Sequence, residues 1–477
     1  MNTQWSIESF FQLLQRNDEP AILLDDSPAI TYHQLLSSID TNVRLLQPSG
    51  PSGQSCIVTI DVSLSWRFIP LMLAAFKLRW TVIPIDSVHD KTLAHKMNAE
   101  FPHALHLDES NVDDTGLIKL SHPPTLIPNI DPQLAHVALM VQTSGTSGHP
   151  KLVMLTYENL ASNAADIVEA LRLESHERIL IQRPLSYSSA LTGELLAGLA
   201  AGSAIYIKPA AYSPLLTLSL IQKHAITTIG SSPTLLTLLA PHTSKYDMSS
   251  LQRIILSGER LTETQLATIL TAYPNNVSLW NAYGMTETAP RISCLQIDSD
   301  KHKAACVGPP LRHVNVAIVN SNGGPVPEGS SGFLIVSGPN VMRGYYNNPE
   351  LTQQKIRDGW LFTGDTASIQ NGMIIIHGRA DHMIIRAGCN IYPEEIESLI
   401  AGCPGVYEAY AFGIPHSRRG AEIHVWLTCA DGVTTLDIQQ YLLNIDANPR
   451  LWPDVIHVRD ELPKTSTGKR FRATPPI

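Results

Sequence analysis

The chain has 477 residues and a formal net charge of −9, with 44% hydrophobic and 16% charged residues. This length exceeds the size at which one hydrophobic core stops growing, so at least two domains are expected. The composition is that of a globular protein and excludes a disordered chain. The negative charge provides no electrostatic footprint for a nucleic-acid partner, so any phosphate-binding site must be local.

The cysteines and the apolar segments indicate the compartment. Six cysteines are scattered along the chain without a C-x-x-C pair. Such a pattern is typical of reduced thiols and argues against a disulfide framework or a zinc ribbon. Glu8 precedes any apolar stretch that could serve as a signal core. The apolar segments 69–76 and 195–207 are too short and too interrupted to span a bilayer. We therefore expect a cytoplasmic protein without a membrane span.

Helical and strand patterns alternate from the N-terminus onward. A helical pattern covers Ile7 to Leu14, and Thr31 is a candidate N-cap for a short helix. Between Cys56 and Asp86 the segments CIVTIDV, SWRFIPLMLAAFKLRW and TVIPID follow one another. Their periodicities predict a strand, an amphipathic helix and a second strand, and therefore a parallel βαβ unit.

The connection from residue 89 to residue 120 contains three histidines, His95, His103 and His106. Three histidines in one segment raise the question of a metal site. Because no cysteine and no helical i, i+4 histidine pair accompanies them, we expect surface histidines without a metal.

The segment MVQTSGTSGHPK, residues 140–151, combines an apolar strand end, a run of Thr, Ser and Gly, and a lysine. Successive backbone N–H groups in a Gly-permissive loop can form an anion-binding concavity, to which hydroxyl groups add donors. The loop is not a Walker A motif, because the spacing differs and Leu152 follows the lysine. A plain Ser/Gly surface loop would have the same composition. The candidate polyphosphate-binding residues are Thr143, Ser144, Gly145, Thr146, Ser147, Gly148 and Lys151.

Two more βαβ patterns follow. RILIQRP and SAIYIKP predict strands around the helix of LTGELLAGLAAG, and LQRIILSGE and VSLWNAYG predict strands around TETQLATILTAYP. Repeated βαβ units predict a doubly wound sheet, whose ligands bind beyond the carboxyl ends of the strands. The loop after Val141, the segment 257–259 and the turn after Trp280 lie at such ends. Gly258 and Glu259 are therefore candidate ligand-binding residues.

The chain beyond residue 183 carries four further segments with polar, chemically useful residues. They are PLSYSS at 184–189, NAYGMTET at 281–288, DGWLFTGD at 358–365 and LPKTSTGKRFR at 462–472. An aromatic ring can stack on a nucleotide base, a hydroxyl can donate to phosphate, and the hard oxygens of a carboxylate suit Mg²⁺. The segment HGRADHMIIRAGCNIYPEEIE, residues 377–397, marks a change from α/β alternation to a small α+β tail.

Taken in order, TSGTSG-x-PK, Y-G-M-T-E, T-G-D, H-G-R-A-D and P-K-T-x-x-G-K resemble the motifs of the acyl-adenylate-forming superfamily. Its members are acyl-CoA and aryl-CoA synthetases, firefly luciferase and the adenylation domains of nonribosomal peptide synthetases. The resemblance covers nearly the whole chain, and GPNVMRGYYNNPELT is nearer to the acyl-CoA synthetases. It implies an α/β fold with doubly wound sheets in a large N-terminal domain, residues 1–379. A small, mobile α+β C-terminal domain, residues 380–477, is implied to carry the catalytic lysine.

The resemblance also implies roles for the matched residues in acid activation. Lys469 stands in the place of the catalytic lysine, and Thr286 would donate to the α-phosphate. Glu287 would bind Mg²⁺, and Tyr187 would close over the substrate carboxylate. The nucleotide would be bound by the loop residues given above and by Gly258, Glu259, Asn281, Tyr283, Gly284, Asp365 and Arg379.

Two matched residues relate to the second half-reaction. Asp381 resembles the hinge about which the C-terminal domain rotates, and Gly388 leaves room for a pantetheine thiol arm. The implied activity is ATP-dependent activation of a carboxylic acid to acyl-AMP with release of pyrophosphate, followed by transfer to a thiol. The implied cofactors and partners are ATP, Mg²⁺, a small carboxylic acid, and CoA or a carrier-protein phosphopantetheine.

The sequence leaves the substrate and the acceptor open. PLSYSS offers no Asp to pair a substrate ammonium, and Glu194 is expected to lie toward the following helix, so an uncharged acyl or aryl tail is favoured. Gly284 stands where acetate-activating relatives carry a Trp, so the pocket need not be limited to a two-carbon acid. The alternatives are a stand-alone enzyme that loads an acyl, aryl or amino acid onto a carrier protein, and a non-catalytic nucleotide-binding protein that kept the fold.

Overall fold

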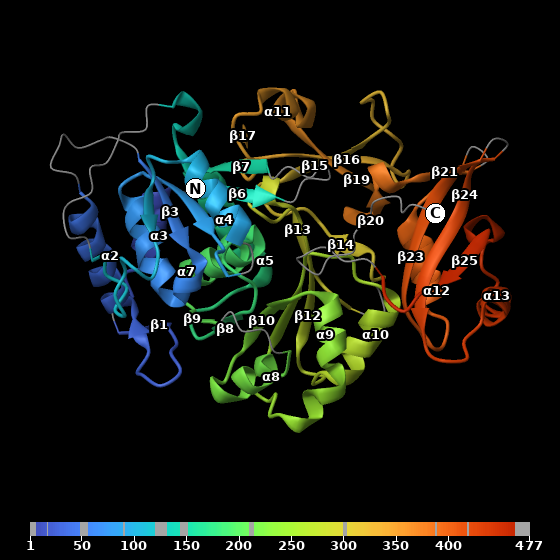
Figure 1. Ribbon diagram of the computed structural model, residues 1–477, viewed down its shortest axis with the longest axis horizontal. Coiled ribbons are helices and arrows are strands. Elements are labelled where there is room, and N and C mark those ends of the chain that lie inside the picture. Colours follow the sequence, from blue (N-terminus) through green and yellow to red (C-terminus); the bar gives the residue numbers. More distant parts are fainter. Residues whose placement is uncertain are drawn as a thin grey trace.

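The computed structural model shows a mixed α/β protein with a large N-terminal domain and a smaller C-terminal domain (Figure 1). It describes residues 6–16, 18–47, 56–88, 91–119, 131–143, 151–208, 214–298, 303–386, 389–416 and 419–462. The first elements of the chain lie in the left-hand part of Figure 1, and the last strands lie at the right-hand end. Among the helices described, none combines the length and the apolar character needed to cross a membrane.

The first sheet has eight strands in the order β13-β12-β11-β10-β8-β9-β1-β2. Neighbours from β12 to β1 are parallel, and the two outer pairs are antiparallel. The strands are β1 Pro20–Ile22, β2 Ile30–Thr31, β8 Arg178–Ile181, β9 Ala204–Ile207, β10 Thr228–Ser231, β11 Arg253–Leu256, β12 Ser278–Tyr283 and β13 Ser293–Gln296.

Helices cover both faces of this sheet. In β11, Ile254 and Leu256 pack with α8 (Pro214–Lys223), α9 (Pro233–Leu239) and α10 (Glu263–Ala272). Ile255, between them, faces the opposite side and packs with α5 (Tyr157–Leu171) and α7 (Ala197–Ala201). Because successive side chains of a strand point to opposite faces, one apolar run fills two cores. The predicted doubly wound sheet is confirmed.

The second sheet has six strands in the order β17-β7-β6-β4-β3-β5. Its parallel part, β6-β4-β3-β5, is covered by α3 (Phe68–Lys77) on one face and α4 (Lys91–Glu100) on the other. The predicted βαβ unit between Cys56 and Asp86 is therefore confirmed as β3, α3 and β4. The strands are β3 Ile57–Asp61, β4 Thr81–Ile85, β5 Leu105–Leu107, β6 Val137–Thr143, β7 Lys151–Thr156 and β17 Gly344–Tyr345.

A third, antiparallel sheet of six strands lies between these sheets and the C-terminal domain (Figure 1). Its order is β14-β20-β19-β16-β15, with β18 beside β19. The strands are β14 Cys306–Gly308, β15 Asn315–Val319, β16 Gly332–Ser337, β18 Ile356–Arg357, β19 Trp360–Gln370 and β20 Met373–Arg379.

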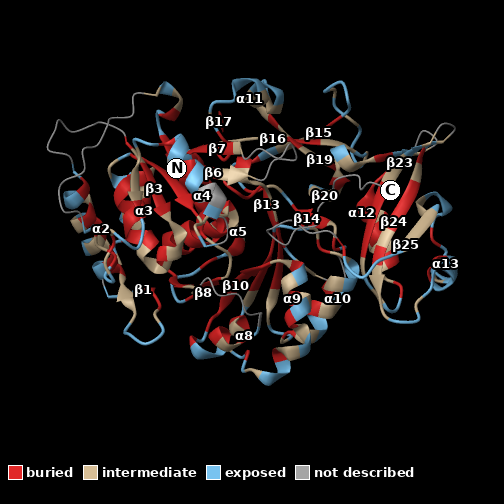
Figure 2. Ribbon diagram, in the orientation of Figure 1, coloured by how far each residue is buried: buried red, intermediate tan, exposed pale blue. Residues whose placement is uncertain are grey.

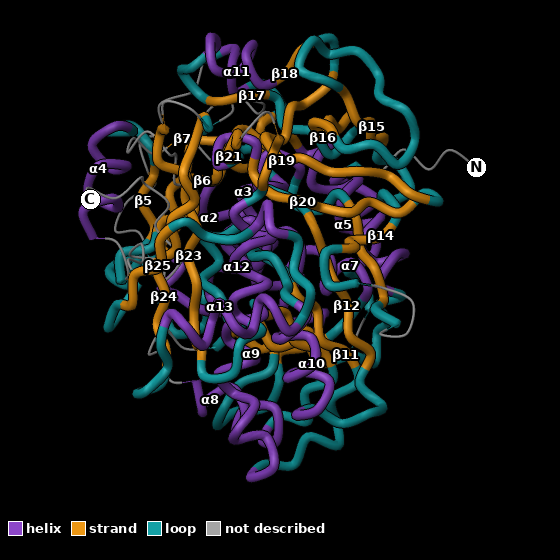
Figure 3. The backbone as a smooth tube through the Cα atoms, turned by 90° about the vertical axis from the view of Figure 1, so that its right-hand side faces the viewer, coloured by secondary structure: helices purple, strands orange, loops and turns teal. Residues whose placement is uncertain are grey.

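The C-terminal domain faces the viewer in Figure 3. The strands β23 (Val406–His416), β24 (Gly420–Cys429) and β25 (Val455–Val458) form a sheet whose one face packs against α12 (Pro393–Ala401) and α13 (Thr435–Asn444). A hairpin of β21 (Ile384–Arg386) and β22 (Cys389–Ile391) joins the same core. This is the small α+β unit that the sequence predicts.

Local sequence signals account for several helix starts. Thr31 caps α2 in a reciprocal capping box with Gln34, as its sequence predicts, but the helix is longer than expected, since α2 runs Tyr32–Leu46. Thr156 and Thr262 begin α5 and α10 in the same way. The strands are buried and the outer sides of α9 and α10 exposed (Figure 2). The remaining helices are α1 Ile7–Leu13, α6 Ser188–Ala190 and α11 Pro349–Lys355, and a π-helical turn spans Leu191–Leu196.

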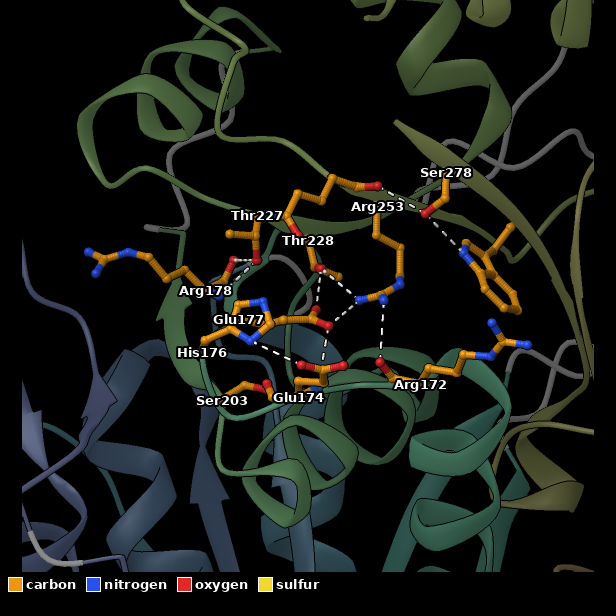
Figure 4. A network of polar contacts seen from close by, with 12 residues as sticks. Arg172, Glu174, His176, Glu177, Arg178, Ser203, Thr227, Thr228, Arg253 and Ser278 are labelled. Atoms are coloured by element: carbon orange, nitrogen blue, oxygen red, sulfur yellow. Dashed lines mark hydrogen bonds and ion pairs between the residues drawn. The ribbon is translucent and has the colours of Figure 1, made fainter. Parts of the chain in front are cut away.

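A buried ion pair fixes the amino ends of the central strands, opposite the predicted ligand-binding end (Figure 4). Glu177, just before β8, pairs with Arg253 at the start of β11, and Thr228 of β10 donates to the same carboxylate at 2.5 Å. The Glu177 side chain is 3% exposed and that of Arg253 14%. Three strands are thereby held in register at one end, which leaves the other end for function.

Candidate active site

The carboxyl end of β6 and the start of β7 place two of the predicted phosphate-binding residues together. Thr143 and Lys151 are register partners in this antiparallel pair, so they stand at the base of the Thr/Ser/Gly loop. The Lys151 Nζ lies 5.8 Å from the ring centre of Tyr345. The other predicted loop residues, Ser144, Gly145, Thr146, Ser147 and Gly148, lie outside the described residues, as do Gly388 and Lys469.

Tyr345 connects this loop base to the NAYGMTET segment. Its hydroxyl donates a hydrogen bond of 2.7 Å to Oε1 of the buried Glu287. Burial and the adjacent carboxylate raise the pKa of Tyr345, so the phenol remains a donor at neutral pH. One residue earlier, the Thr286 Oγ1 lies 3.1 Å from the Ser188 Oγ. Lys151, Tyr345, Glu287, Thr286 and Ser188 thus form a continuous polar surface.

The Glu287 environment fits a magnesium ion. Mg²⁺ in nucleotide sites is usually held by one or two carboxylates together with substrate phosphates and water. Glu287 provides one such carboxylate, and Tyr345 orients it while leaving Oε2 for another partner. A single buried carboxylate beside the predicted phosphate-binding loop is a donor set that suits such a site.

A second cluster joins β12 to the third sheet. The Tyr283 hydroxyl donates to Oδ2 of Asp365, and Oδ1 of Asp365 lies 3.4 Å from Nη1 of Arg379. The Arg379 Nε donates in turn to Asp381 at 3.2 Å. Burial raises the pKa of Asp365, against the opposing charge of Arg379. The structure therefore brings together four residues for which the sequence predicts nucleotide or hinge roles.

Lys355, at the end of α11, is a cation that sequence reasoning missed. Burial lowers the pKa of this lysine, and the positive charges of Arg379 and Lys151 lower it further, while Glu287 opposes them. Lys355 therefore adds a positive charge to the predicted phosphate site. It lines a cavity of about 340 Å³ together with Phe362 and Gly364. Its segment, QQKIRDGW, runs into DGWLFTGD, but the lysine itself matched no motif residue, so it was not singled out.

Three predicted nucleotide-binding residues have contacts within the protein. The Asn281 Nδ2 donates to the carbonyls of Ala304 (3.1 Å) and Cys306 (2.9 Å), which ties β12 to the segment before β14. The exposed Glu259 accepts from the backbone of Thr234 at 2.8 Å, near the start of α9. Gly258 has φ +92°, a conformation that favours glycine. Their ligand roles remain predictions.

Gly284 lies where no side chain fits. A Cβ there would come within 1.9 Å of the Pro290 carbonyl oxygen and 2.9 Å of the Arg291 Cα. The glycine therefore allows the segment after Thr288 to return directly against the end of β12. Tyr187, at the start of α6, is half-buried, and burial raises the pKa of its phenol, with a further contribution from Asp86.

Glu194 lies in the helical segment after Tyr187, as expected, within the π-helical turn at 191–196. Sequence reasoning did not anticipate that its side chain is 1% exposed and forms an ion pair with Arg183. The region where an uncharged substrate tail was favoured therefore contains buried charges.

The three histidines of the connection after β4 are placed apart from this site. His106 Nδ1 lies 2.6 Å from the Thr59 Oγ1, and His95 lines a separate cavity of about 470 Å³ beyond the ends of β3, β4 and β5. Within the part of the chain that the structure describes, no group of three His, Cys, Asp or Glu residues could hold a metal ion.

Comparisons with known proteins identify the family and the fold of the chain. The model of the AMP-binding enzyme family matches residues 11–346, and the model of the AMP-binding enzyme C-terminal domain matches residues 395–469. The chain is 32% identical to a long-chain-fatty-acid–CoA ligase of Bacillus subtilis over 96% of this chain and 85% of that protein. It is 32% identical to a feruloyl-CoA synthase of Amycolatopsis over 72% and 70%.

Solved structures show the same fold. ATP-bound MatB from Rhodopseudomonas palustris superposes with a TM-score of 0.82 at 24% identity, over 98% of this chain and 97% of that one. An o-succinylbenzoate CoA synthetase from Bacillus subtilis has a TM-score of 0.79 over 98% and 97%, also at 24% identity. From the family models and the curated relatives together, the chain belongs to the AMP-binding enzyme family.

Proposed function

We propose that this protein is an AMP-forming acid–thiol ligase, which activates a carboxylic acid with ATP and transfers the acyl group to CoA. The observation that carries the proposal is the convergence of two clusters beside the loop base of Thr143 and Lys151. One is Glu287 with Tyr345, and the other is Tyr283 with Asp365 and Arg379. Relatives that are named as CoA ligases support it.

In the first half-reaction an oxygen of the carboxylate attacks the α-phosphorus. A new P–O bond forms, the bond to the β-phosphate breaks, and pyrophosphate leaves. Thr286 and Ser188 offer hydroxyl donors at one point of the site, and Lys151 and Lys355 provide positive charge near the phosphates. Preorganised donors and charges of this kind stabilise the charge that develops in phosphoryl transfer.

The nucleoside is proposed to bind at Asp365, whose two carboxylate oxygens can accept hydrogen bonds from both ribose hydroxyls. The adenine would stack on Tyr283, and the positive charge of Arg379 favours the charged form of Asp365 against the effect of its burial. Mg²⁺, when bound at Glu287, supplies positive charge to the phosphates. Lys469 is proposed to reach the α-phosphate from the C-terminal domain.

In the second half-reaction the thiol sulfur attacks the acyl carbon. The thioester bond forms, AMP leaves, and the thiol proton passes to solvent. The C-terminal domain, residues 380–477, is proposed to rotate about Asp381 between the two steps and to admit the thiol arm past Gly388. Asp381 is bound to Arg379 of the preceding strand at 3.2 Å, so rotation has to exchange this contact.

A carrier-protein phosphopantetheine in place of CoA is the alternative acceptor. Both acceptors end in the same thiol arm, so the residues described above serve either. We also propose that the enzyme requires Mg²⁺ and acts in the cytoplasm. The cysteines that the structure describes are free thiols and are buried or half-buried, which is consistent with a reducing compartment.

The test is pyrophosphate release with ATP and Mg²⁺ across a panel of fatty, aryl, dicarboxylic and amino acids, with and without CoA. We expect at least one acid to release pyrophosphate and to yield a CoA thioester. Release without a thioester would favour the carrier protein as acceptor. If no acid in the panel releases pyrophosphate, although circular dichroism shows that the protein is folded, the proposed function is overturned.

A further inference from the structure

Three charged side chains gather at the carboxyl ends of the first sheet, next to the proposed site. Arg183 follows β8, Glu194 lies in the π-helical turn, and Arg291 precedes β13. Arg291 is 3% exposed, and Glu194 likewise. The Ser257 hydroxyl, directly after β11, accepts hydrogen bonds from Arg183 at 3.0 Å and from Arg291 at 3.3 Å. We call these four residues the arginine cluster.

The charges of the arginine cluster do not balance. Arg183 is paired with Glu194, whereas Arg291 has no carboxylate within ion-pair distance among the described residues. Its Nε has no hydrogen-bond acceptor, and the Ser231 hydroxyl and Glu194 Oε2 also lack partners. A guanidinium stays protonated at neutral pH, so the cluster carries one surplus buried positive charge. Burial of an uncompensated charge is strongly unfavourable, so binding of an anion beside Arg291 would be favourable.

The fold makes room for this cluster with two glycines. A Cβ on Gly230 would come within 2.3 Å of Glu194 Oε1, and a Cβ on Gly193 within 3.3 Å of Arg291 Nη2. The Glu194 carboxylate and the Arg291 guanidinium therefore occupy space that the side chain of a larger residue at position 230 or 193 would fill. π-Helical turns are frequently found at functional sites, and this one positions both Gly193 and Glu194.

The arginine cluster borders the position of the reacting groups. Arg291 is held against Gly284, two residues before Thr286, and its backbone is fixed by Asn163 on α5 at 2.9 and 3.0 Å. On the other side, the helix that begins at Ser188, the partner of Thr286, continues into the turn that carries Glu194. An acid whose carboxylate lies at Thr286 would thus extend its tail toward Arg291.

We propose that the substrate is a dicarboxylic acid, whose second carboxylate pairs with Arg291 while the first is activated. This inference rests on the proposed function and names its substrate class. A second carboxylate would neutralise the surplus charge and give Arg291 Nε an acceptor. The ion pair of Arg183 with Glu194 would hold the cluster together and disfavour a substrate ammonium, since two guanidinium groups already surround the single carboxylate.

The experiment compares matched acids that differ only in the terminal group, from four to ten carbons. Each set contains a monocarboxylic acid, the dicarboxylic acid and the ω-amino acid, and kcat/KM is measured by pyrophosphate release. A site built to bind a polar group rejects an analogue that lacks it by a large factor. We expect the best dicarboxylic acid to exceed its monocarboxylic counterpart by at least about 100-fold. A preference for the monocarboxylic or the ω-amino acid would overturn the proposal.

Variants at Arg291 separate recognition from a structural role. R291M should lose about 100-fold or more on the dicarboxylic acid and little on the monocarboxylic acid, whereas R291K should retain part of the preference. R312M is the matched control, because Arg312 is exposed and paired with Glu169 away from the site. An equal loss by R291M on both acids would show that Arg291 only supports the fold.

Thermal unfolding without ATP keeps this inference distinct from the proposed ligase activity. Dicarboxylic acids should raise the Tm of the unaltered protein and of R312M, but not that of R291M. If dicarboxylic acids raise the Tm in an Arg291-dependent way but no acid releases pyrophosphate, the ligase function is overturned and the dicarboxylate-binding site is supported. Absence of both effects would overturn both.

Discussion

Glu287 receives a hydrogen bond from Tyr345, a residue 58 positions further along the chain. The phenol fixes the direction in which the carboxylate presents its second oxygen. Groups that orient a metal ligand in this way commonly change metal affinity 10–100-fold when they are removed. The contribution of this contact can therefore be measured through magnesium rather than through ATP.

Y345F should raise the Mg²⁺ concentration at half-maximal pyrophosphate release by roughly 10-fold. The ring remains to pack in the core, and only the hydroxyl that bonds Glu287 is lost. Y346F is the matched control, because Tyr346 is the next residue and its ring packs at a tilt against Phe101, outside the site. An unchanged magnesium requirement in Y345F would argue against Glu287 as the metal ligand.

K469A should lower the rate of adenylate formation by at least about 100-fold, because the ammonium group would no longer stabilise charge on the α-phosphate. Transfer of the acyl group from a supplied acyl-AMP to CoA should be largely retained. The two half-reactions are followed by pyrophosphate release and by thioester formation. Unchanged pyrophosphate release would refute the role of Lys469.

Among the single residues of the candidate site, sequence reasoning identified those at motif positions and missed those that tertiary packing brings to the site from other segments. Glu287, Asp365 and Arg379 were named from local patterns. Ser188 lies in PLSYSS and Tyr345 in GPNVMRGYYNNPELT, but neither residue was singled out, and Lys355 follows the second segment. The pairing of β17 with β7 brings Tyr345 to Glu287, and α11, which follows β17, carries Lys355. Arg183 and Arg291 were missed for the same reason.

Among the elements, the central strands of the first sheet depend on charges at their amino ends. Glu177 is buried and Arg253 is mostly buried, so removing one partner leaves the other uncompensated (Figure 4). E177Q should reduce the free energy of unfolding in urea by about 3 kcal/mol. The kcat/KM at low temperature should not change, because the site lies at the opposite end of the strands.

Two further variants test this interpretation. E177L/R253M replaces both charges by apolar groups and should regain most of the lost stability. E174Q is the control, since Glu174 is 67% exposed and its ion pair with His176 is at the surface. A stability of E177Q equal to that of E174Q would contradict a stabilising role for the buried pair.

Asp25, just after β1, connects three elements. Burial opposes its charged form, but hydrogen bonds from Lys223, Tyr206 and His224 outweigh that effect and lower the pKa of Asp25 to about 2. A depressed pKa contributes stability that is complete above the unfolded value near 4 and is lost as the pH falls toward 2. The contribution should therefore be constant between pH 5 and 7.

D25N should lower the urea midpoint at pH 7, and its difference from the unaltered protein should shrink as the pH falls from about 4 toward 2. D26N provides the control, because Asp26 is 96% exposed and lies 3.9 Å from Lys223. A D25N difference that stays constant down to pH 2 would show that the charge of Asp25 does not stabilise this corner of the sheet.

The spacing of apolar residues predicted most helices and strands, because the pattern of each element repeats over several residues. The alternation in β11 and the apolar pattern of α3 were visible in sequence. The π-helical turn was not, since LTGELL has an ordinary helical pattern and its register shift depends on Gly193 fitting beside Pro290 and Arg291. The burial of Glu194 in this turn and its ion pair with Arg183 were therefore not predicted.

For the whole molecule, the fold class and the order of the two domains were predictable, and the domain boundary at 379 and 380 remains a prediction. The third sheet spans the region between the doubly wound part and the C-terminal domain, and Tyr392 lies 3.2 Å from Ser331 across this junction. Contacts of this kind depend on how the domains meet, which no local pattern encodes.

The central claim is that the acid attacks the α-phosphorus of ATP. It is tested most directly by carrying out the CoA-dependent reaction with a substrate labelled with ¹⁸O in its carboxylate. We predict that one ¹⁸O atom appears in AMP, because the bridging oxygen of the acyl-AMP remains with phosphorus when the thiol takes the acyl group. Label in inorganic phosphate, with ADP as the other product, would show attack at the γ-phosphate and would contradict the account.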